Sequence, residues 1–235
     1  MTHDLESVGA IIKLTRRAFG QRLESEPNLG LFDVQVPPLC PVESEYPDLA
    51  SFERAICECQ KCPLGRGRTK FVFGVGHPHA DIMFIGEAPG RDEDLKGEPF
   101  VGRAGQLLDK ILAAIKLSRQ EVYIANILKC RPPENRDPLP EEATACLPYL
   151  LQQIRIIQPK LICCLGRIAA QFLMDTKTPL GKLRGRFHDY YGTKLLVTYH
   201  PAALLRFPAY KKDAWEDMQL LRREYDRLMG RPPAV

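Results

Sequence analysis

Residues 81–90 read DIMFIGEAPG, and this stretch is the strongest indication of the fold. Its first half is a short apolar run of the kind that forms a fully buried strand. Its second half, GEAPG, is a turn rich in glycine and proline that ends the strand. This combination is typical of parallel sheets covered on both faces, in which ligands bind at the carboxyl ends of the strands.

The alternation of strands and helices continues along the chain. Apolar runs predict three further strands, over residues 122–128, 161–165 and 194–199. Apolar residues at helical spacing predict helices over residues 105–117, 140–158, 167–174 and 215–228. Strands that alternate with helices predict an α/β fold, with a mostly parallel sheet between two layers of helices.

The first 47 residues differ in character from the rest. Apolar positions over 5–24 predict an amphipathic helix, and five prolines between residues 27 and 47 predict an extended arm. We therefore expect an N-terminal extension over 1–47 and a compact domain over 48–235.

Composition narrows the class of protein. The chain has 235 residues, 45% of them hydrophobic, and a net charge of +4, which permits a polyanionic partner without requiring one. No apolar run reaches the length of about 18 residues that a membrane span needs. The N-terminus also lacks the apolar segment of a signal peptide, so we expect a cytoplasmic protein with no membrane partner.

The chain contains eight cysteines, which in an intracellular protein are not expected to form disulfides. Cys59 and Cys62 form a C-x2-C pair, and Cys130 and Cys146 follow much later. Four thiolates can hold zinc or an iron–sulfur cluster, and the spacing excludes neither. Cys57 competes with Cys59 as a ligand. Charged neighbours such as Lys129 argue against placing these cysteines in a dry core.

Three further segments carry groups suited to binding or catalysis. The string GEPFVGRAG at residues 97–105 has glycine turns that lead into a helix, an arrangement able to bind an anion. Asn126, near the end of a predicted strand, can both donate and accept hydrogen bonds, which suits the edge of a base. His200 opens the string HPAALLR directly after another strand.

Together these segments resemble the family 4 uracil-DNA glycosylases, the iron–sulfur branch of that superfamily. The resemblance covers residues 59–215. It implies a three-layer α/β/α fold with a central four-stranded parallel sheet. It also implies a monomeric DNA-repair enzyme that hydrolyses the glycosidic bond of uracil in single- or double-stranded DNA, releases free uracil and leaves an abasic site.

The resemblance assigns roles in uracil binding to individual positions. The backbone of Gly86, Glu87 and Ala88 would line the pocket. Phe100 would stack on the flipped base, and Asn126 would read its Watson–Crick edge.

The resemblance also assigns roles in catalysis. His200 would stabilise the negative charge that develops on the uracil O2 atom. An acid stands at the position of Ala88 in other branches of the superfamily, so Glu87 or Glu93 would have to orient the water. Glu93 could instead exclude the 5-methyl group of thymine.

The remaining carried-over roles concern DNA and the cluster. Leu204 and Leu205 would wedge into the duplex, and Arg206 would contact a phosphate. A [4Fe–4S] cluster would be held by Cys59, Cys62, Cys130 and Cys146.

Two departures and two alternatives accompany the resemblance. Ala202 stands where serine is common in the superfamily. The basic, histidine-containing insert of relatives that trap uracil covalently is missing between Gly105 and Asn126.

The alternatives are a non-catalytic DNA-binding module on the same fold and a zinc-stabilised nucleotide-binding protein. The latter lacks the G-x-x-x-x-G-K-[ST] string.

Overall fold

The computed structural model describes residues 46–232 and residue 234. The amphipathic helix predicted over 5–24 and most of the proline-rich arm lie outside the described residues. The first described helix, α2 (Leu49–Ile56), begins directly after Asp48, whose side chain accepts a hydrogen bond from the Ser51 amide at 2.7 Å. Such an N-cap satisfies one of the free amides of the first turn.

The described residues form one six-stranded sheet, ordered β1-β3-β2-β4-β6-β5. Its four inner strands are parallel, and the two edge strands are antiparallel to their neighbours. In chain order the strands are β1 (Val75–Gly76), β2 (Ile82–Gly86), β3 (Tyr123–Asn126), β4 (Leu161–Leu165), β5 (Phe187–Tyr190) and β6 (Thr193–Thr198). The four predicted strands are confirmed as the parallel centre of the sheet.

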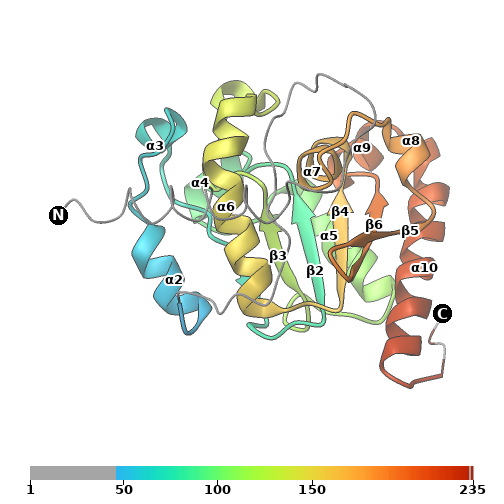
Figure 1. The fold of residues 1–235 in the computed structure, drawn as a ribbon. Helices are drawn as coiled ribbons and strands as arrows, with labels where there is room; N and C mark the ends of the chain where they lie inside the picture. Colours follow the sequence, from blue (N-terminus) through green and yellow to red (C-terminus); the bar gives the residue numbers. More distant parts are fainter. Residues whose placement is uncertain (1–45, 233, 235) are drawn as a thin grey trace, which may run out of the picture. The chain divides into compact units, whose positions relative to one another are not determined.

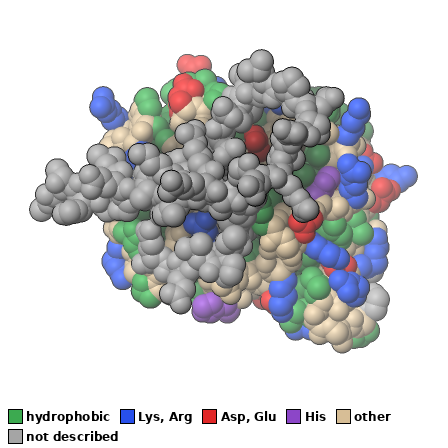
Figure 2. Space-filling model, viewed as in Figure 1, with side chains coloured by type: hydrophobic (Ala, Val, Ile, Leu, Met, Phe, Trp, Pro, Cys, Tyr) green, Lys and Arg blue, Asp and Glu red, His purple; other side chains and the backbone are tan. Residues whose placement is uncertain are grey.

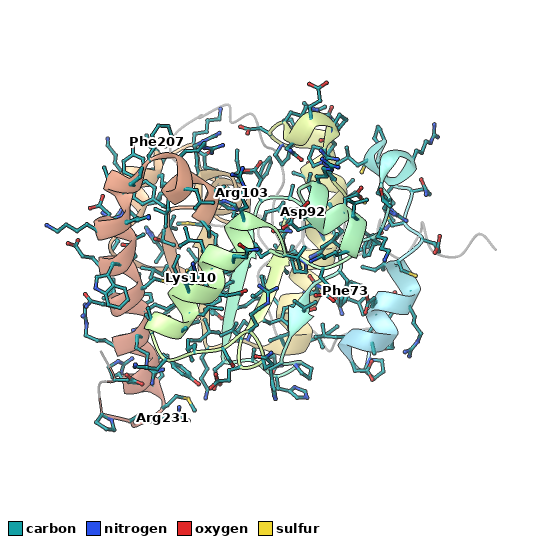
Figure 3. All side chains as sticks on the ribbon, turned by 180° about the vertical axis from the view of Figure 1, so that it is seen from behind. Phe73, Asp92, Arg103, Lys110, Phe207 and Arg231 are labelled. Atoms are coloured by element: carbon teal, nitrogen blue, oxygen red, sulfur yellow. The ribbon has the colours of Figure 1, made fainter. Side chains whose placement is uncertain are left out.

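Helices cover both faces of the sheet, which confirms the three-layer α/β/α fold. α5 (Arg103–Ala114) and α10 (Lys211–Leu228) lie on one face, and α6 (Pro140–Ile157) and α7 (Arg167–Leu173) lie on the other (Figures 1 and 3). These four helices match the predicted ones within a few residues at each end.

The core on the α5 side follows from the register of the strands. Phe84 of β2 pairs with Cys163 of β4, and both belong to one buried cluster. That cluster includes Leu108 of α5 and Leu221 of α10, which are fully buried. Burying a side chain of this size contributes about 1.5–3 kcal/mol.

Several short elements were not predicted. The edge strand β5 carries the mixed sequence FHDY and is only partly buried, so it lacks an apolar run that could mark it. The edge strand β1 was not predicted either, and the other short elements are α3 (Leu64–Gly67), α4 (Arg91–Lys96), η1 (Pro133–Asn135), α8 (Leu180–Leu183), α9 (Pro201–Arg206) and η2 (Pro208–Tyr210). α4 and α9 matter most because they follow the carboxyl ends of β2 and β6.

Cationic and acidic side chains both lie on the part of the surface where Figure 2 shows described residues. Lys and Arg side chains are interspersed there with acidic ones, as a net charge of +4 would suggest. Within the described residues, no helix is both long and apolar enough to cross a membrane.

Candidate active site

Three predicted site residues lie at the carboxyl edge of the parallel sheet. Gly86 is the last residue of β2, and its register partner Asn126 is the last residue of β3. His200 follows β6 after one residue. The fold therefore brings these positions to one edge of the sheet, where open α/β sheets bind ligands.

Asn126 is the polar centre of this edge. It is 2% exposed, and its Oδ1 atom has no hydrogen-bond partner among the described residues. A buried acceptor without a partner costs about 1–3 kcal/mol, so such groups are rare unless a ligand satisfies them. In the described part of the chain, the Oδ1 atom of Asn126 is therefore a buried acceptor with its hydrogen-bonding capacity unused.

Gly86 lets Phe100 approach Asn126 closely. A Cβ atom on Gly86 would lie 2.4 Å from the Asn126 Oδ1 atom and 2.7 Å from the ring of Phe100. The glycine, the amide and the aromatic ring thus meet at one point. Any larger residue at Gly86 would fill this space.

Phe100 is held in an unusual backbone conformation. Its φ angle is 54°, a left-handed value that is uncommon outside glycine, and its side chain is buried. Arg119 fixes the turn by donating hydrogen bonds to the carbonyl oxygens of Phe100 (3.1 Å) and Pro99 (2.8 Å). Strain of this kind is typical of functional sites. No pattern in the sequence pointed to Arg119, which lies 19 residues from Phe100.

His200 faces the same ring. The ring centroids of Phe100 and His200 are 5.4 Å apart. The His200 Nδ1 atom accepts a hydrogen bond from the Ala202 amide at 3.1 Å, in the first turn of α9. Burial, with a smaller effect of Arg206, lowers the pKa of His200 to about 4. The imidazole is therefore neutral at pH 7 and carries its proton on Nε2.

The two candidate carboxylates occupy different environments. Glu93 accepts hydrogen bonds from the amides of Gly90 (3.1 Å), Val101 (2.9 Å) and Gly102 (3.0 Å). It ties the start of α4 to the loop that carries Phe100. Burial first, and then the charge of Asp137, raises the pKa of Glu87 to about 7. Glu93 is thus built into the loop, whereas Glu87 can exchange a proton near neutral pH.

The HPAALLR segment forms α9, and the helix separates its two leucines. Leu204 is 2% exposed, whereas Leu205 is 46% exposed. Leu204 packs in the interior, so the structure does not present it to DNA. The expectation of an apolar wedge therefore narrows to Leu205, which precedes the exposed Arg206.

The four predicted cysteine ligands lie together, about one pocket. Cys59, Cys62, Cys130 and Cys146 line it, together with Phe71 and Tyr149. Cys57 does not line this pocket, and its Sγ atom lies 3.5 Å from the Arg54 carbonyl oxygen. Cys59 therefore lines the pocket and Cys57 does not, a distinction that the spacing of the cysteines in the sequence left open.

Three of the four sulfur atoms already accept hydrogen bonds. Tyr149 Oη donates to Cys59 Sγ at 3.2 Å, Arg68 to Cys130 Sγ at 3.4 Å, and the Lys129 amide to Cys146 Sγ at 3.2 Å. Donors around sulfur stabilise metal-bound thiolates. Among the described residues, however, no three His, Cys, Asp or Glu side chains are grouped closely enough for a single metal ion.

The profile described as Uracil DNA glycosylase superfamily matches residues 73–219. The type-4 uracil-DNA glycosylase of Archaeoglobus fulgidus is 49% identical over 174 residues, covering 71% of this chain and 87% of the relative. The type-4 enzyme of Saccharolobus solfataricus is 48% identical over 174 residues, covering 70% and 81%. This chain belongs to the type-4 uracil-DNA glycosylases. A further type-4 relative, from Thermotoga maritima, is 48% identical over 151 residues, covering 63% and 79%.

In this glycosylase a buried lysine connects the cysteine pocket to the strand edge. Lys129 is fully buried, and its Nζ atom donates to the Asn126 carbonyl oxygen at 3.0 Å and to Gln153 Oε1 at 2.6 Å. Burial lowers its pKa to about 8. The expectation that such charges keep the cysteines out of the interior is wrong, because Cys130 and Cys146 are buried as well. The lysine is accommodated by its two acceptors.

Proposed function

We propose a residue-level mechanism for the uracil-DNA glycosylase activity that type-4 membership assigns to this chain. The enzyme hydrolyses the N-glycosidic bond of a uracil flipped out of single- or double-stranded DNA. The products are free uracil and an abasic site. The observation that carries the proposal is the buried Oδ1 atom of Asn126, which lies beside Phe100 and has no hydrogen-bond partner within the described residues.

Asn126 and Phe100 recognise the base. The Oδ1 atom of Asn126 accepts a hydrogen bond from uracil N3–H, and its amide group donates to O4. The ring of Phe100 stacks on the base, while the backbone of Gly86, Glu87 and Ala88 closes the pocket. Glu93 shapes the pocket through its three backbone hydrogen bonds, and so sets the space available for a 5-methyl group.

His200 stabilises the leaving group. As the glycosidic bond breaks, the electron pair remains on uracil and negative charge develops on O2. The neutral His200 donates from Nε2 to that oxygen, and its own tautomer is fixed by the Ala202 amide. One donor of this kind is worth about 3 kcal/mol in the transition state.

Glu87 orients the water that attacks the sugar carbon. Its ionised form accepts a proton from the water and offers negative charge to the oxocarbenium-like sugar. Glu93 is less suited to this role because its carboxylate already accepts three backbone hydrogen bonds. The preference for Glu87 rests on its pKa of about 7.

A [4Fe–4S] cluster fits the cysteine pocket. The thiols of Cys59, Cys62, Cys130 and Cys146 line its walls, with hydrogen-bond donors to three of them. A single tetrahedral zinc ion would instead draw all four sulfur atoms to about 2.3 Å from one point. When bound, the cluster supplies a structural cross-link and no redox step. The cysteines that would hold it lie in the segment after α2, just beyond the end of β3 and in α6.

DNA binds along the edge that carries α9. Leu205 enters the space left by the flipped nucleotide, as apolar wedges do in other proteins that unstack a duplex. Arg206 contacts a backbone phosphate. Release of free uracil from oligonucleotides with a single uracil, in duplex and in single-stranded form, tests the proposal. A protein that binds such DNA without releasing uracil would instead be a binding module.

A further inference from the structure

The segment that follows the proposed wedge exposes an aromatic side chain. Phe207 is 55% exposed, the largest value among the big hydrophobic side chains of the described residues. It stands next to Leu205 and Arg206, and Tyr210 is also exposed. Single exposed hydrophobic residues are common, but a group of them beside a site needs an explanation.

The backbone of Phe207 is fixed on both sides. Its amide donates to the Ala203 carbonyl oxygen at 2.8 Å, and its carbonyl oxygen accepts from the Tyr210 amide at 3.1 Å. Phe207 thus occupies the corner between α9 and η2 and is followed by Pro208. Because these two hydrogen bonds restrain the backbone of Phe207, its side chain is held at the surface in a defined position.

The ring of Phe207 is supported from one side by other aromatic rings. Its centroid lies 5.9 Å from that of Tyr210, which in turn stacks on Tyr199 at 4.4 Å with an interplanar angle of 4°. Arg184 lies over the ring of Tyr199 at 5.6 Å. The ring is therefore held in place before any ligand arrives, which lowers the entropic cost of binding.

The charge around Phe207 favours a polyanion. Residues 205–212 read LRFPAYKK and contain three cations and no acid. Arg206, Lys211 and Lys212 are all exposed. The next acids along the chain are Asp213, Glu216 and Asp217. Arg184 pairs with Asp213 at 3.5 Å and with Asp217 at 3.0 Å, whereas Glu216 is exposed. Exposed aromatic rings between cations are the features with which proteins bind unpaired nucleic acid strands.

Phe207 also lies at the end of the molecule that carries the candidate active site. Figure 3 shows it at the same end as Arg103 and Asp92, which flank the loop of Phe100, and opposite Arg231. His200 caps α9, and Phe207 is the residue that ends this helix. About two turns of helix thus separate the proposed catalytic group from the exposed ring.

We propose that Phe207 is a stacking platform for a nucleobase adjacent to the flipped uracil, with Arg206, Lys211 and Lys212 binding the neighbouring phosphates. The inference rests on the proposed function, since it assumes that DNA lies along α9. Its occupant is a DNA strand with an unpaired or unstacked base. The platform would hold the strand on one side of the lesion while Leu205 fills the gap.

The test measures binding separately from excision. The probe is a single-stranded oligonucleotide with a C-nucleoside analogue of deoxyuridine, whose glycosidic bond cannot be hydrolysed. In two further oligonucleotides, the base on the 5′ or the 3′ side of the analogue is replaced by an abasic sugar. Phe207→Ala is compared with Leu228→Ala, which removes an exposed side chain near the other end of α10.

We expect Phe207→Ala to bind the intact probe about tenfold more weakly than the wild type. Removing one of the two flanking bases should weaken the wild type by a similar factor and leave Phe207→Ala unaffected. Phe207→Trp in a Trp215→Phe background should restore affinity, and its fluorescence should be quenched by the intact probe. Leu228→Ala should bind every probe as the wild type does.

Equal affinity of Phe207→Ala and the wild type for the intact probe would overturn the inference. So would a loss of affinity that is the same with and without each flanking base. Uracil release by the wild type is measured in parallel on a cleavable substrate. If the wild type releases uracil and Phe207→Ala binds normally, only the stacking role fails. If the wild type releases none, the proposed function fails.

Discussion

The imidazole of His200 shows how single residues acquire their roles from their surroundings. An exposed histidine is partly charged near neutral pH, whereas burial lowers the pKa of this one to about 4. The Ala202 amide occupies Nδ1 and leaves the proton on Nε2. The residue therefore offers a hydrogen bond without adding a full charge to the pocket.

We expect His200→Ala to lower the single-turnover rate of uracil release by about 10²-fold or more, because the lost hydrogen bond is strongest in the transition state. Affinity for uracil-containing DNA should change little. Rapid-quench measurement of released uracil, with a binding titration on the same duplex, checks both values. An unchanged rate would assign the anion-stabilising role to another group.

The pH dependence of the rate should distinguish Glu87 from Glu93. With a pKa of about 7, Glu87 is increasingly protonated as the pH falls from 8 to 6. The proposed mechanism needs the ionised form to orient the water, so the single-turnover rate of the wild type should fall over that range. Glu87→Gln should be slower and nearly independent of pH there.

Glu93→Gln is the matched control for this prediction. It weakens the backbone hydrogen bonds that hold the Phe100 loop, so it should lower the melting temperature and keep the slope of the pH profile. A Glu87→Gln variant with the slope of the wild type would remove Glu87 from the mechanism.

At the scale of elements, α9 divides its side chains between the core and the surface. Leu204 lies three residues after the buried Pro201, so both project from the same side of the helix, whereas Leu205 is rotated by about 100°. Of the two leucines, Leu205 alone is exposed.

Truncating each leucine should therefore have a different effect. Leu204→Ala should lower the free energy of unfolding by about 2–5 kcal/mol, as for other buried leucines. Leu205→Ala should change it by less than about 0.5 kcal/mol. It should also slow excision from duplex DNA far more than from single strands. Chemical denaturation measures the free energies of unfolding, and the ratio of the excision rates on duplex and single-stranded DNA tests the wedge. If Leu205→Ala slows excision equally on both substrates, the wedge is contradicted.

At the scale of the whole molecule, the cysteine pocket joins segments that are distant in the chain. Cys59 and Cys62 lie between α2 and α3, Cys130 lies just after β3, and Cys146 belongs to α6. A cluster bound by all four would restrain a loop, a strand end and a helix at once.

Protein purified without oxygen should therefore be coloured and contain about four irons per chain. Alanine at Cys59, Cys62, Cys130 or Cys146 should reduce the iron content, bleach the colour and lower the melting temperature. Cys57→Ala should do none of these, because Cys57 lies outside the pocket. Metal analysis that finds one zinc and no iron in the wild type would contradict the cluster.

The sequence sufficed for the centre of the fold but not for its details. Apolar runs such as IMFIG and LICCL mark the parallel strands because both of their faces are buried. The edge strand β5 has no such run, and α4 lies inside a stretch that reads as a loop. Burial of a whole strand leaves a pattern in the sequence, whereas an edge or a single turn does not.

The candidate site was predictable only in part for the same physical reason. Motifs placed Asn126 and His200 at the ends of strands and Phe100 in a glycine-rich loop, and the structure brings the three together. The clamp from Arg119 and the buried position of Lys129 depend on contacts between distant segments. No spacing in the sequence reveals such contacts.

The most direct test of the account is the release of free uracil under single-turnover conditions by the wild type and by Asn126→Ala. The wild type should release uracil from a duplex with a single uracil and leave an abasic site. Asn126→Ala should do so far more slowly, because the base then loses the hydrogen bonds that hold it in the pocket. Release of uracil at the same rate by both proteins, or by neither, would contradict the placement of the active site at the carboxyl edge of the sheet.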